Sequence, residues 1–283
     1  MLDVASIPDA PPAELRFRAR PSLITSVREL IGARELILTL AERDLRARYK
    51  QAVLGFLWVF IQPLALLVMF SFIARRVGHV STSGVPYGLF AFAGLLPWTF
   101  FSASLNTGGL SLLNNSALLN KVYCPRQAFP LAGMTVAAVD ASVSALTFGM
   151  LFAIDGFAPR ATAVWLPVVI AVQLVFTAAA TLLLSSVVVY VRDLRNALPL
   201  VLQVGLFAMP IAYPLTTFSP GWRKVYSAIN PLGPVIDGYR QTLLFGHAPD
   251  WTLTAIAATS AAAMLAFAVF VFGRLSRGMA DVL

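Results

Sequence analysis

Six long apolar runs, separated by shorter polar segments, organise this chain of 283 residues. They cover residues 54–74, 87–107, 128–154, 163–190, 197–217 and 251–272. A helix needs about 20 apolar residues to cross the roughly 30 Å hydrocarbon core of a bilayer. Each run reaches that length, so the pattern predicts an all-α integral membrane protein with six transmembrane helices. The segments between the runs are too short for a second folded domain.

The composition supports a membrane protein. Hydrophobic residues make up 58% of the chain and charged residues 12%, against about 45–50% and about 25% in ordinary globular proteins. So few charged side chains cannot cover the surface of a soluble protein. The single cysteine, Cys124, excludes an intrachain disulfide and a cysteine-rich metal site.

The basic residues predict the orientation in the membrane. With the N-terminus inside, 15 of the 21 Lys and Arg residues lie in cytoplasmic segments. Such an excess is typical of cytoplasmic loops, so six spans with both termini in the cytoplasm are expected. The same rule explains the net charge of +8, and no nucleic-acid partner is expected.

A basic amphipathic segment precedes the first run. Residues 23–53 contain no proline, and their apolar side chains approximate one helical face among several arginines. This pattern predicts an N-terminal amphipathic helix lying in the cytoplasmic interface. Residues 1–22 contain four prolines and are expected to form a mobile leader. The third unit is the six-span domain, residues 54–283.

The segment between the fifth and sixth runs has its own pattern. Two short amphipathic runs begin at Pro220 and Pro234, and the sequence Asn230-Pro231-Leu232-Gly233 separates them. Neither run can cross a bilayer. We expect a re-entrant helical hairpin dipping in from the outer side, because irregular backbone is tolerated at membrane depth only inside protein or along a wet cavity.

Nothing in the sequence indicates an enzyme. His79 and His247 lie in separate loops without a paired carboxylate or thiol, so neither a metal site nor a nucleophile–base pair is visible. None of the three lysines follows a glycine, so a phosphate-binding loop is absent. We expect no catalytic residue, no metal site and no cofactor bound by this chain.

Asp140 is the one acidic or basic side chain inside the six runs. At the bilayer centre an aspartate costs on the order of 3 kcal/mol, so it should face protein or water. One interpretation is proton coupling. The other, favoured because no second titratable group lies in the runs, is a structural hydrogen bond to neighbouring hydroxyl or peptide groups. Four hydroxyl residues lie close in sequence: Thr135, Ser142, Ser144 and Thr147.

Aromatic residues are concentrated in the first two runs, where residues 54–107 hold 11 of the 32 in the chain. Rings near the ends of spans ordinarily form interfacial belts. Alternatively, their faces could line a path for a sugar chain. The sequence alone leaves both interpretations open.

Four segments of the chain carry a resemblance to a known family. They are Leu40–Leu64, Lys121–Arg126 with the later Asp140, Val191–Leu194, and Asn230–Arg240. Together they resemble the polysaccharide-exporting ABC transporter permeases, the family that handles O-antigen, capsular polysaccharide and teichoic acid. Their order and spacing match the family from about residue 25 to the C-terminus.

The resemblance implies a function and partners. The chain would be the permease subunit of an exporter in the bacterial inner membrane, moving a polyprenyl-pyrophosphate-linked polysaccharide. It would form a homodimer around a central channel and bind two copies of a cytoplasmic ATPase, which holds the ATP and Mg. Rival functions are a related ABC permease for a drug or small lipid, an ion-driven secondary transporter, and a membrane-embedded enzyme or assembly factor.

The resemblance also implies site residues. The expected substrate path comprises Arg46, Arg48, Tyr49, Lys50, Phe56, Trp58, Tyr87, Trp98 and Asp140. The expected ATPase-coupling surface comprises Leu118, Lys121, Tyr123, Arg126, Arg192 and Asp193. The expected outer gate comprises Asn230, Asp237, Tyr239 and Arg240.

Each group of site residues has a simpler interpretation. The cations of the path either meet the pyrophosphate or only anchor the helix at the membrane surface. The coupling loop could be an ordinary polar turn, and Arg192 and Asp193 could merely pair with each other. The outer hairpin could be a lid that seals the dimer.

Overall fold

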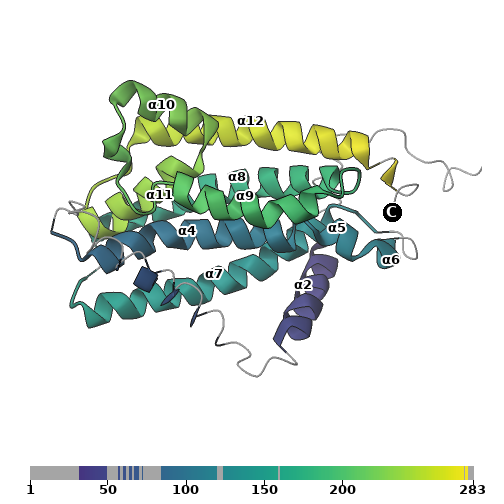
Figure 1. Cartoon of the computed structure of the whole chain (residues 1–283), viewed down its shortest axis with the longest axis horizontal. Coiled ribbons are helices and arrows are strands. Elements are labelled where there is room, and N and C mark those ends of the chain that lie inside the picture. Colours follow the sequence, from purple (N-terminus) through teal and green to yellow (C-terminus); the bar gives the residue numbers. More distant parts are fainter. Residues whose placement is uncertain are drawn as a thin grey trace, which may run out of the picture.

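The computed structural model describes residues 32–49, 84–119, 124–158, 160–276 and 278–279, together with single positions between 57 and 72. Every long regular element in this part of the chain is a helix (Figure 1). The predicted all-α architecture is therefore confirmed for the described residues. The predicted leader and most of the first run lie outside them.

Among the described residues, four helices are long and apolar enough to cross a membrane. They are α4 (Tyr87–Thr107), α7 (Ala128–Ile154), α8 (Leu166–Val187) with the preceding 3-10 turn η3 (Ala161–Trp165), and α12 (Trp251–Leu275). They run along the long axis of the molecule (Figure 1). Their lengths of 21–27 residues correspond to about 32–40 Å of helix at 1.5 Å per residue. The second and third runs were predicted with these same boundaries, and the fourth and sixth within three residues.

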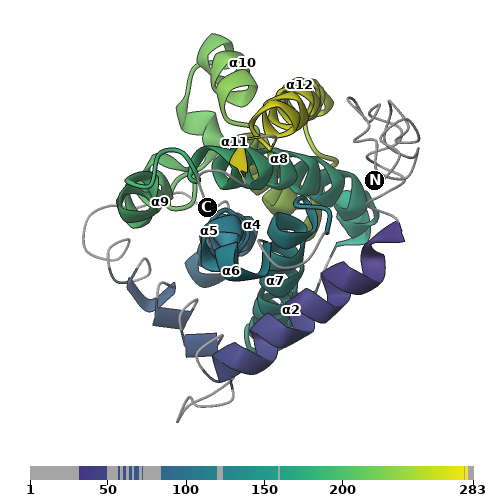
Figure 2. The ribbon, with the colours of Figure 1, turned by 90° about the vertical axis from the view of Figure 1, so that its right-hand side faces the viewer.

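The most buried of the four is α4, which lies among α7, α8 and α9 (Figure 2). Glycines bring it close to α7: a Cβ on Gly133 would lie 2.4 Å from the Cα of Gly108. Close backbone approach at small residues is a principal source of helix packing inside membranes, because lipid supplies no hydrophobic drive between helices.

The fifth predicted span is wrong in its second half. The helix α9 (Leu194–Ala208) has 15 residues, about 22 Å. It is followed by an irregular segment and the 3-10 turn η4 (Leu215–Thr217). Pro210 and Pro214 lack a backbone N–H and disfavour helix in the residue before them. The apolar side chains of Ile211 and Leu215 are instead buried in the protein.

The two predicted short helices are confirmed as α10 (Pro220–Ile229) and α11 (Leu232–Arg240). A π-helical turn, η5 (Gln241–Phe245), ends at Gly246, whose φ of 74° suits glycine. Helix α11 is buried against α4 and α8. The apolar stripe of α10 faces outward instead, since Trp222 is 67% and Ile229 77% exposed.

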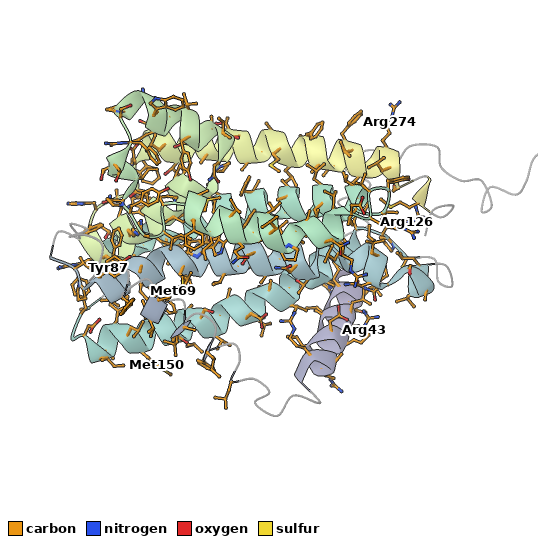
Figure 3. All side chains as sticks on the ribbon, in the orientation of Figure 1. Arg43, Met69, Tyr87, Arg126, Met150 and Arg274 are labelled. Atoms are coloured by element: carbon orange, nitrogen blue, oxygen red, sulfur yellow. The ribbon has the colours of Figure 1, made fainter. Side chains whose placement is uncertain are left out.

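The predicted amphipathic helix is present as α2 (Arg34–Tyr49), which crosses α7 obliquely (Figures 1 and 2). Its Leu40 and Ala41 are buried in one cluster with Phe129 and Val136 of α7. Two one-turn helices, α5 (Ser111–Asn114) and α6 (Ser116–Leu119), form the connection after α4. Basic residues gather at this end of the bundle: Arg43, Arg126 and Arg274 lie at the end opposite Tyr87 (Figure 3).

Candidate functional site

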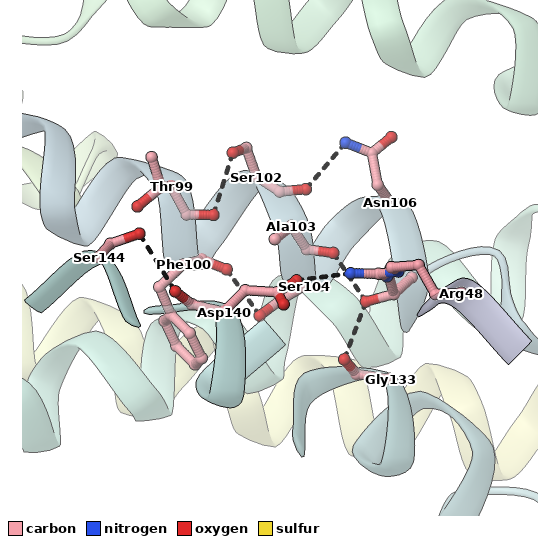
Figure 4. Close-up of polar contacts among 11 residues, drawn as sticks. Arg48, Thr99, Phe100, Ser102, Ala103, Ser104, Asn106, Gly133, Asp140 and Ser144 are labelled. Atoms are coloured by element: carbon pink, nitrogen blue, oxygen red, sulfur yellow. Dashed lines mark hydrogen bonds and ion pairs between the residues drawn. The ribbon is translucent and has the colours of Figure 1, made fainter. Parts of the chain in front are cut away.

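An ion pair joins α2 to the middle of α7. The Arg48 guanidinium donates a 2.6 Å hydrogen bond to the Asp140 carboxylate (Figure 4). The Asp140 side chain is 18% exposed and that of Arg48 39%. Two residues predicted for the substrate path are thus in direct contact, and the charge of Asp140 is balanced.

The hydroxyl groups close to Asp140 in sequence bond to the backbone of their own helix. Thr135, Ser142, Ser144 and Thr147 each donate to the carbonyl four residues earlier, a common arrangement for hydroxyl side chains in membrane helices. For Ser144 that acceptor is the Asp140 carbonyl oxygen. These four hydroxyls thus donate to backbone carbonyls, and the charged partner of the Asp140 carboxylate comes from α2.

Further contacts hold α2 in place. Arg43 donates to the Asp44 carboxylate and, at 2.7 Å, to the side-chain oxygen of Asn115 between α5 and α6. Arg46 pairs with Glu42 one turn earlier, and both side chains are largely exposed. Helix α2 is thus bonded to the loop after α4 as well as to α7.

Four residues of the expected path lie outside the described side chains: Tyr49, Lys50, Phe56 and Trp58.

The aromatic rings of α4 pack inside the chain. Trp98 is 4% exposed and lies against Gly205 of α9, while Phe92 stacks on Phe148 with ring centroids 5.5 Å apart. Tyr87 is half-buried. Within one chain the rings of α4 therefore form core rather than an open lining.

Most of the more exposed positions in the C-terminal half of α4 are polar. Thr99 and Ser102 are partly exposed and Asn106 is exposed. They occur at i, i+3 and i+7, and so share one face. Each side chain donates to a carbonyl of its own helix. Figure 4 shows the bonds donated by Ser102 and Asn106. We missed this strip in the sequence, although three polar residues at helical spacing in an apolar run were a readable signal.

The residues expected to couple to the ATPase gather at one end of the bundle. Leu118 on α6 is half-buried in the cluster beneath α2. Arg126 donates to the Ser276 carbonyl at the end of α12. Arg192 and Asp193 are exposed in the turn between α8 and α9. The hydroxyl of Tyr190 in that turn donates to the Leu275 carbonyl at 2.6 Å. Lys121 and Tyr123 lie outside the described residues.

At the other end, Arg240 of α11 is 1% exposed. Its guanidinium donates to the carbonyl oxygens of Phe90, Pro210, Ile211 and Tyr213 at 2.5–3.2 Å. It also stands 3.7 Å from the centroid of the Phe90 ring. Arg240 therefore fastens the irregular segment after α9 to α4, which is a structural role that the gate prediction did not include.

The neighbouring gate residues are also held by hydrogen bonds. The Tyr239 hydroxyl donates at 2.8 Å to Gln173 of α8, whose amide donates at 3.1 Å to the Pro97 carbonyl of α4. The Asn230 amide donates to the Tyr226 hydroxyl at 2.9 Å. The Tyr239 and Gln173 bonds fix the hairpin against α8 and α4, and the Asn230 bond holds the turn between α10 and α11.

Asp237, the fourth gate residue, carries a carboxyl group whose surroundings shift its pKa. Burial raises the pKa of its carboxyl group above the ordinary value, and the nearby Arg240 guanidinium and a hydrogen bond from Gln241 offset part of that rise. Asp237 also lines a surface cavity. Among the described residues, no three His, Cys, Asp or Glu side chains cluster closely enough to hold a metal ion.

The profile of one protein family, the ABC-2 type transporter, matches residues 35–244. The chain belongs to this family. The match runs from α2 through the outer hairpin, and so contains every contact of α2, α7 and α11 described above. The family and the long apolar helices make this ABC-2 permease a multi-pass membrane protein, as its sequence predicted.

Named relatives of this ABC-2 permease are similar along most of their length. The "O-antigen export system permease protein RfbA" of Myxococcus xanthus is 33% identical over 243 residues, covering 84% of this chain and 92% of that protein. A protein of the same name from Klebsiella pneumoniae is 26% identical over 215 residues, 75% of this chain and 81% of its own. The "Polysialic acid transport protein KpsM" of Escherichia coli is 23% identical over 218 residues, 72% of this chain and 80% of its own.

Proposed function

We propose that this chain is the transmembrane subunit of an ATP-driven exporter that moves a polyprenyl-pyrophosphate-linked polysaccharide across the bacterial inner membrane. The observation that carries the proposal is the similarity, over 84% of the chain, to a protein named for O-antigen export. The relative named for polysialic acid transport adds a second polysaccharide. The shared chemistry is a hydroxyl-rich polymer.

The proposed assembly is a homodimer with two copies of a separate cytoplasmic ATPase. Each chain would cross the membrane six times with both termini in the cytoplasm, and α10 and α11 would form the re-entrant hairpin on the outer side. Burial of α11 against α4 and α8 supports this arrangement, because non-spanning helices at membrane depth need protein around them.

The contacts of α2 suggest how force reaches the spans. In our proposal, ATP binding brings the two ATPase subunits together and pushes α2 and the α5–α6 loop. Arg43 bonds α2 to Asn115 of that loop, and Arg48 bonds it to Asp140 of α7. A displacement of α2 would therefore be passed to α7, and the path between the two permease chains would open.

Complementation tests the function directly. Cells from which the chain has been deleted should lose surface polysaccharide and regain it with the wild-type chain. Tagged chain, gently solubilised, should co-purify with a stoichiometric ATPase. Unchanged surface polysaccharide after deletion would contradict the cargo, and uphill transport by the chain alone in liposomes would contradict the division into permease and ATPase.

Arg46 allows the role of the cations in the substrate path to be tested without breaking the Arg48–Asp140 pair. Arg46 is largely exposed and pairs only within its own helix among the contacts of the described residues. Arg46→Gln should therefore lower export if the exposed cation meets the pyrophosphate, with ATPase binding unchanged. Normal export by this variant would leave membrane anchoring as the role of Arg46.

A further inference from the structure

A polar cavity opens at the end of the bundle that carries the hairpin. Its volume is about 350 Å³, and it lies between η4, α10, α11 with η5, and the start of α12. The polar residues that line it are Thr216, Arg223, Asp237, Gln241 and Asp250. Guanidinium, carboxamide and hydroxyl groups supply donors, and the two carboxylates supply acceptors.

Two charged side chains of this outer cavity, Arg223 and Asp250, are already held by hydrogen bonds before any ligand binds. Arg223 donates to the carbonyl oxygens of Phe218 at 2.8 Å and Thr216 at 3.1 Å. One oxygen of Asp250 accepts from the backbone N–H groups of Thr252 and Leu253 at 3.0 and 3.1 Å, which caps α12. Side chains that are already held lose little conformational entropy when a ligand binds.

The charge of the outer cavity selects the class of ligand. Two carboxylates and the Arg223 guanidinium line the cavity, and the Arg240 guanidinium stands near Asp237. The two negative and two positive charges balance, so the cavity gives neither phosphate nor another anion a net attraction. The guanidinium groups in turn disfavour a bare metal cation. A neutral ligand rich in hydroxyl groups can donate to the carboxylates and accept from the guanidinium and the carboxamide.

The size of the outer cavity fits the same class. A volume of about 350 Å³ equals about twelve water molecules at liquid density, and it lies at the small end of ligand sites. This is room for a single sugar ring with some water. A longer segment would have to extend into solvent.

We propose that the outer cavity is a subsite for one sugar unit of the polysaccharide as the chain leaves the transporter. The proposal rests on the proposed function and adds to it a binding site outside the predicted path. Because the walls come from the hairpin and from α12, an occupant would bridge these two elements. The subsite would thereby retain the emerging chain between strokes of the ATPase.

Filling the outer cavity tests the proposal. Ala248 lines it and is exposed, so Ala248→Trp should occupy the space without removing a polar contact. His247 is exposed in the same loop and does not line the cavity, so His247→Trp is the matched control. Thr216→Val removes one hydroxyl while keeping the side-chain shape.

The measurement is binding to the complete permease–ATPase complex in nanodiscs. The probe is water-soluble polysaccharide released by mild acid from the surface of the native cells. Ala248→Trp should weaken binding at least tenfold and Thr216→Val severalfold, with His247→Trp unchanged. No binding to the wild-type complex, or equal binding by Ala248→Trp, would overturn the subsite.

Complementation of the deletion strain separates the two proposals. If the wild-type chain does not restore surface polysaccharide, the proposed function fails. If it does and the Ala248→Trp complex, purified with its full share of ATPase, binds the probe as the wild type does, only the subsite fails.

Discussion

The Arg48–Asp140 ion pair can be tested by a double-mutant cycle with Arg48→Gln and Asp140→Asn. Each substitution removes a charge and keeps a polar side chain of similar size. Because the two side chains contact each other at 2.6 Å, the effect of the double variant should be smaller than the sum of the single effects. The difference is the coupling free energy of the pair.

The expected coupling follows from burial. A hydrogen bond to a charged group contributes about 1.5–3 kcal/mol to stability, whereas an exposed ion pair contributes about 0–1 kcal/mol. The Asp140 side chain is 18% exposed, but Arg48 at 39% is open to screening by solvent. We therefore expect about 1–2 kcal/mol, which is roughly a tenfold change in an equilibrium constant.

Equilibrium unfolding of the purified chain in mixed micelles, with increasing SDS, measures these free energies. Arg46→Gln is the control, because its exposed pair with Glu42 within one helix should contribute at most about 0.5 kcal/mol. A coupling below about 0.5 kcal/mol, or Asp140→Asn as stable as the wild type, would refute the role of the pair. Normal stability with lost export would instead favour the proton-relay interpretation of Asp140.

Three further predictions concern other contacts. Arg240→Lys should destabilise the chain by about 2–4 kcal/mol, since an ammonium group cannot donate to four carbonyls at once; Arg195→Lys, at an exposed site, should leave the melting temperature unchanged. Gly133→Ala should lower folded yield because its Cβ would collide with the end of α4, whereas Gly149→Ala on the same helix meets nothing within 4 Å; equal yields would contradict this close approach. Burial raises the pKa of the Asp237 carboxyl group, so the folded state binds the carboxyl proton more tightly than the unfolded state. The contribution of Asp237 to the free energy of unfolding therefore falls as pH rises above about 4. The melting temperature of Asp237→Asn relative to wild type should therefore increase with pH, and a constant difference would contradict the shift.

Helix boundaries were predictable where polarity and backbone chemistry change at the same residue. Helix α4 begins directly after Pro86 and ends before Gly108, and α7 ends at the Asp155-Gly156 turn. At these places hydropathy falls and the backbone favours a turn, so two independent signals coincide. The sequence therefore predicted both helices to the residue.

The end of α9 shows what hydropathy alone misses. The apolar run continues past Ala208, so counting apolar residues extends the span to residue 217. Backbone hydrogen bonding ends the helix earlier, because Pro210 and Pro214 cannot donate. Both prolines were visible in the sequence, but a proline alone does not decide a boundary, because Pro97 and Pro199 lie inside α4 and α9. Arg240 donates to the backbone carbonyls that the end of the helix leaves without a helical partner. This donor could not be predicted, because it follows those carbonyls by some 30 residues and no local pattern links them.

For Asp140 the sequence predicted the need for a polar partner but not which residue supplies it. Its cost in lipid correctly required a polar partner, but we sought that partner among residues of the spans, whereas Arg48 lies 92 residues earlier on α2. Asp140 is the thirteenth residue of α7, about 18 Å along the helix from its start. Arg48 of α2 reaches this point. If α2 lies in the cytoplasmic interface, Asp140 lies at the depth of that interface too. The first half of α7 then runs beside α2 rather than through the hydrocarbon centre. The cost of the charge is then modest, and α2 and α7 can move as one body under a push from the cytoplasmic side.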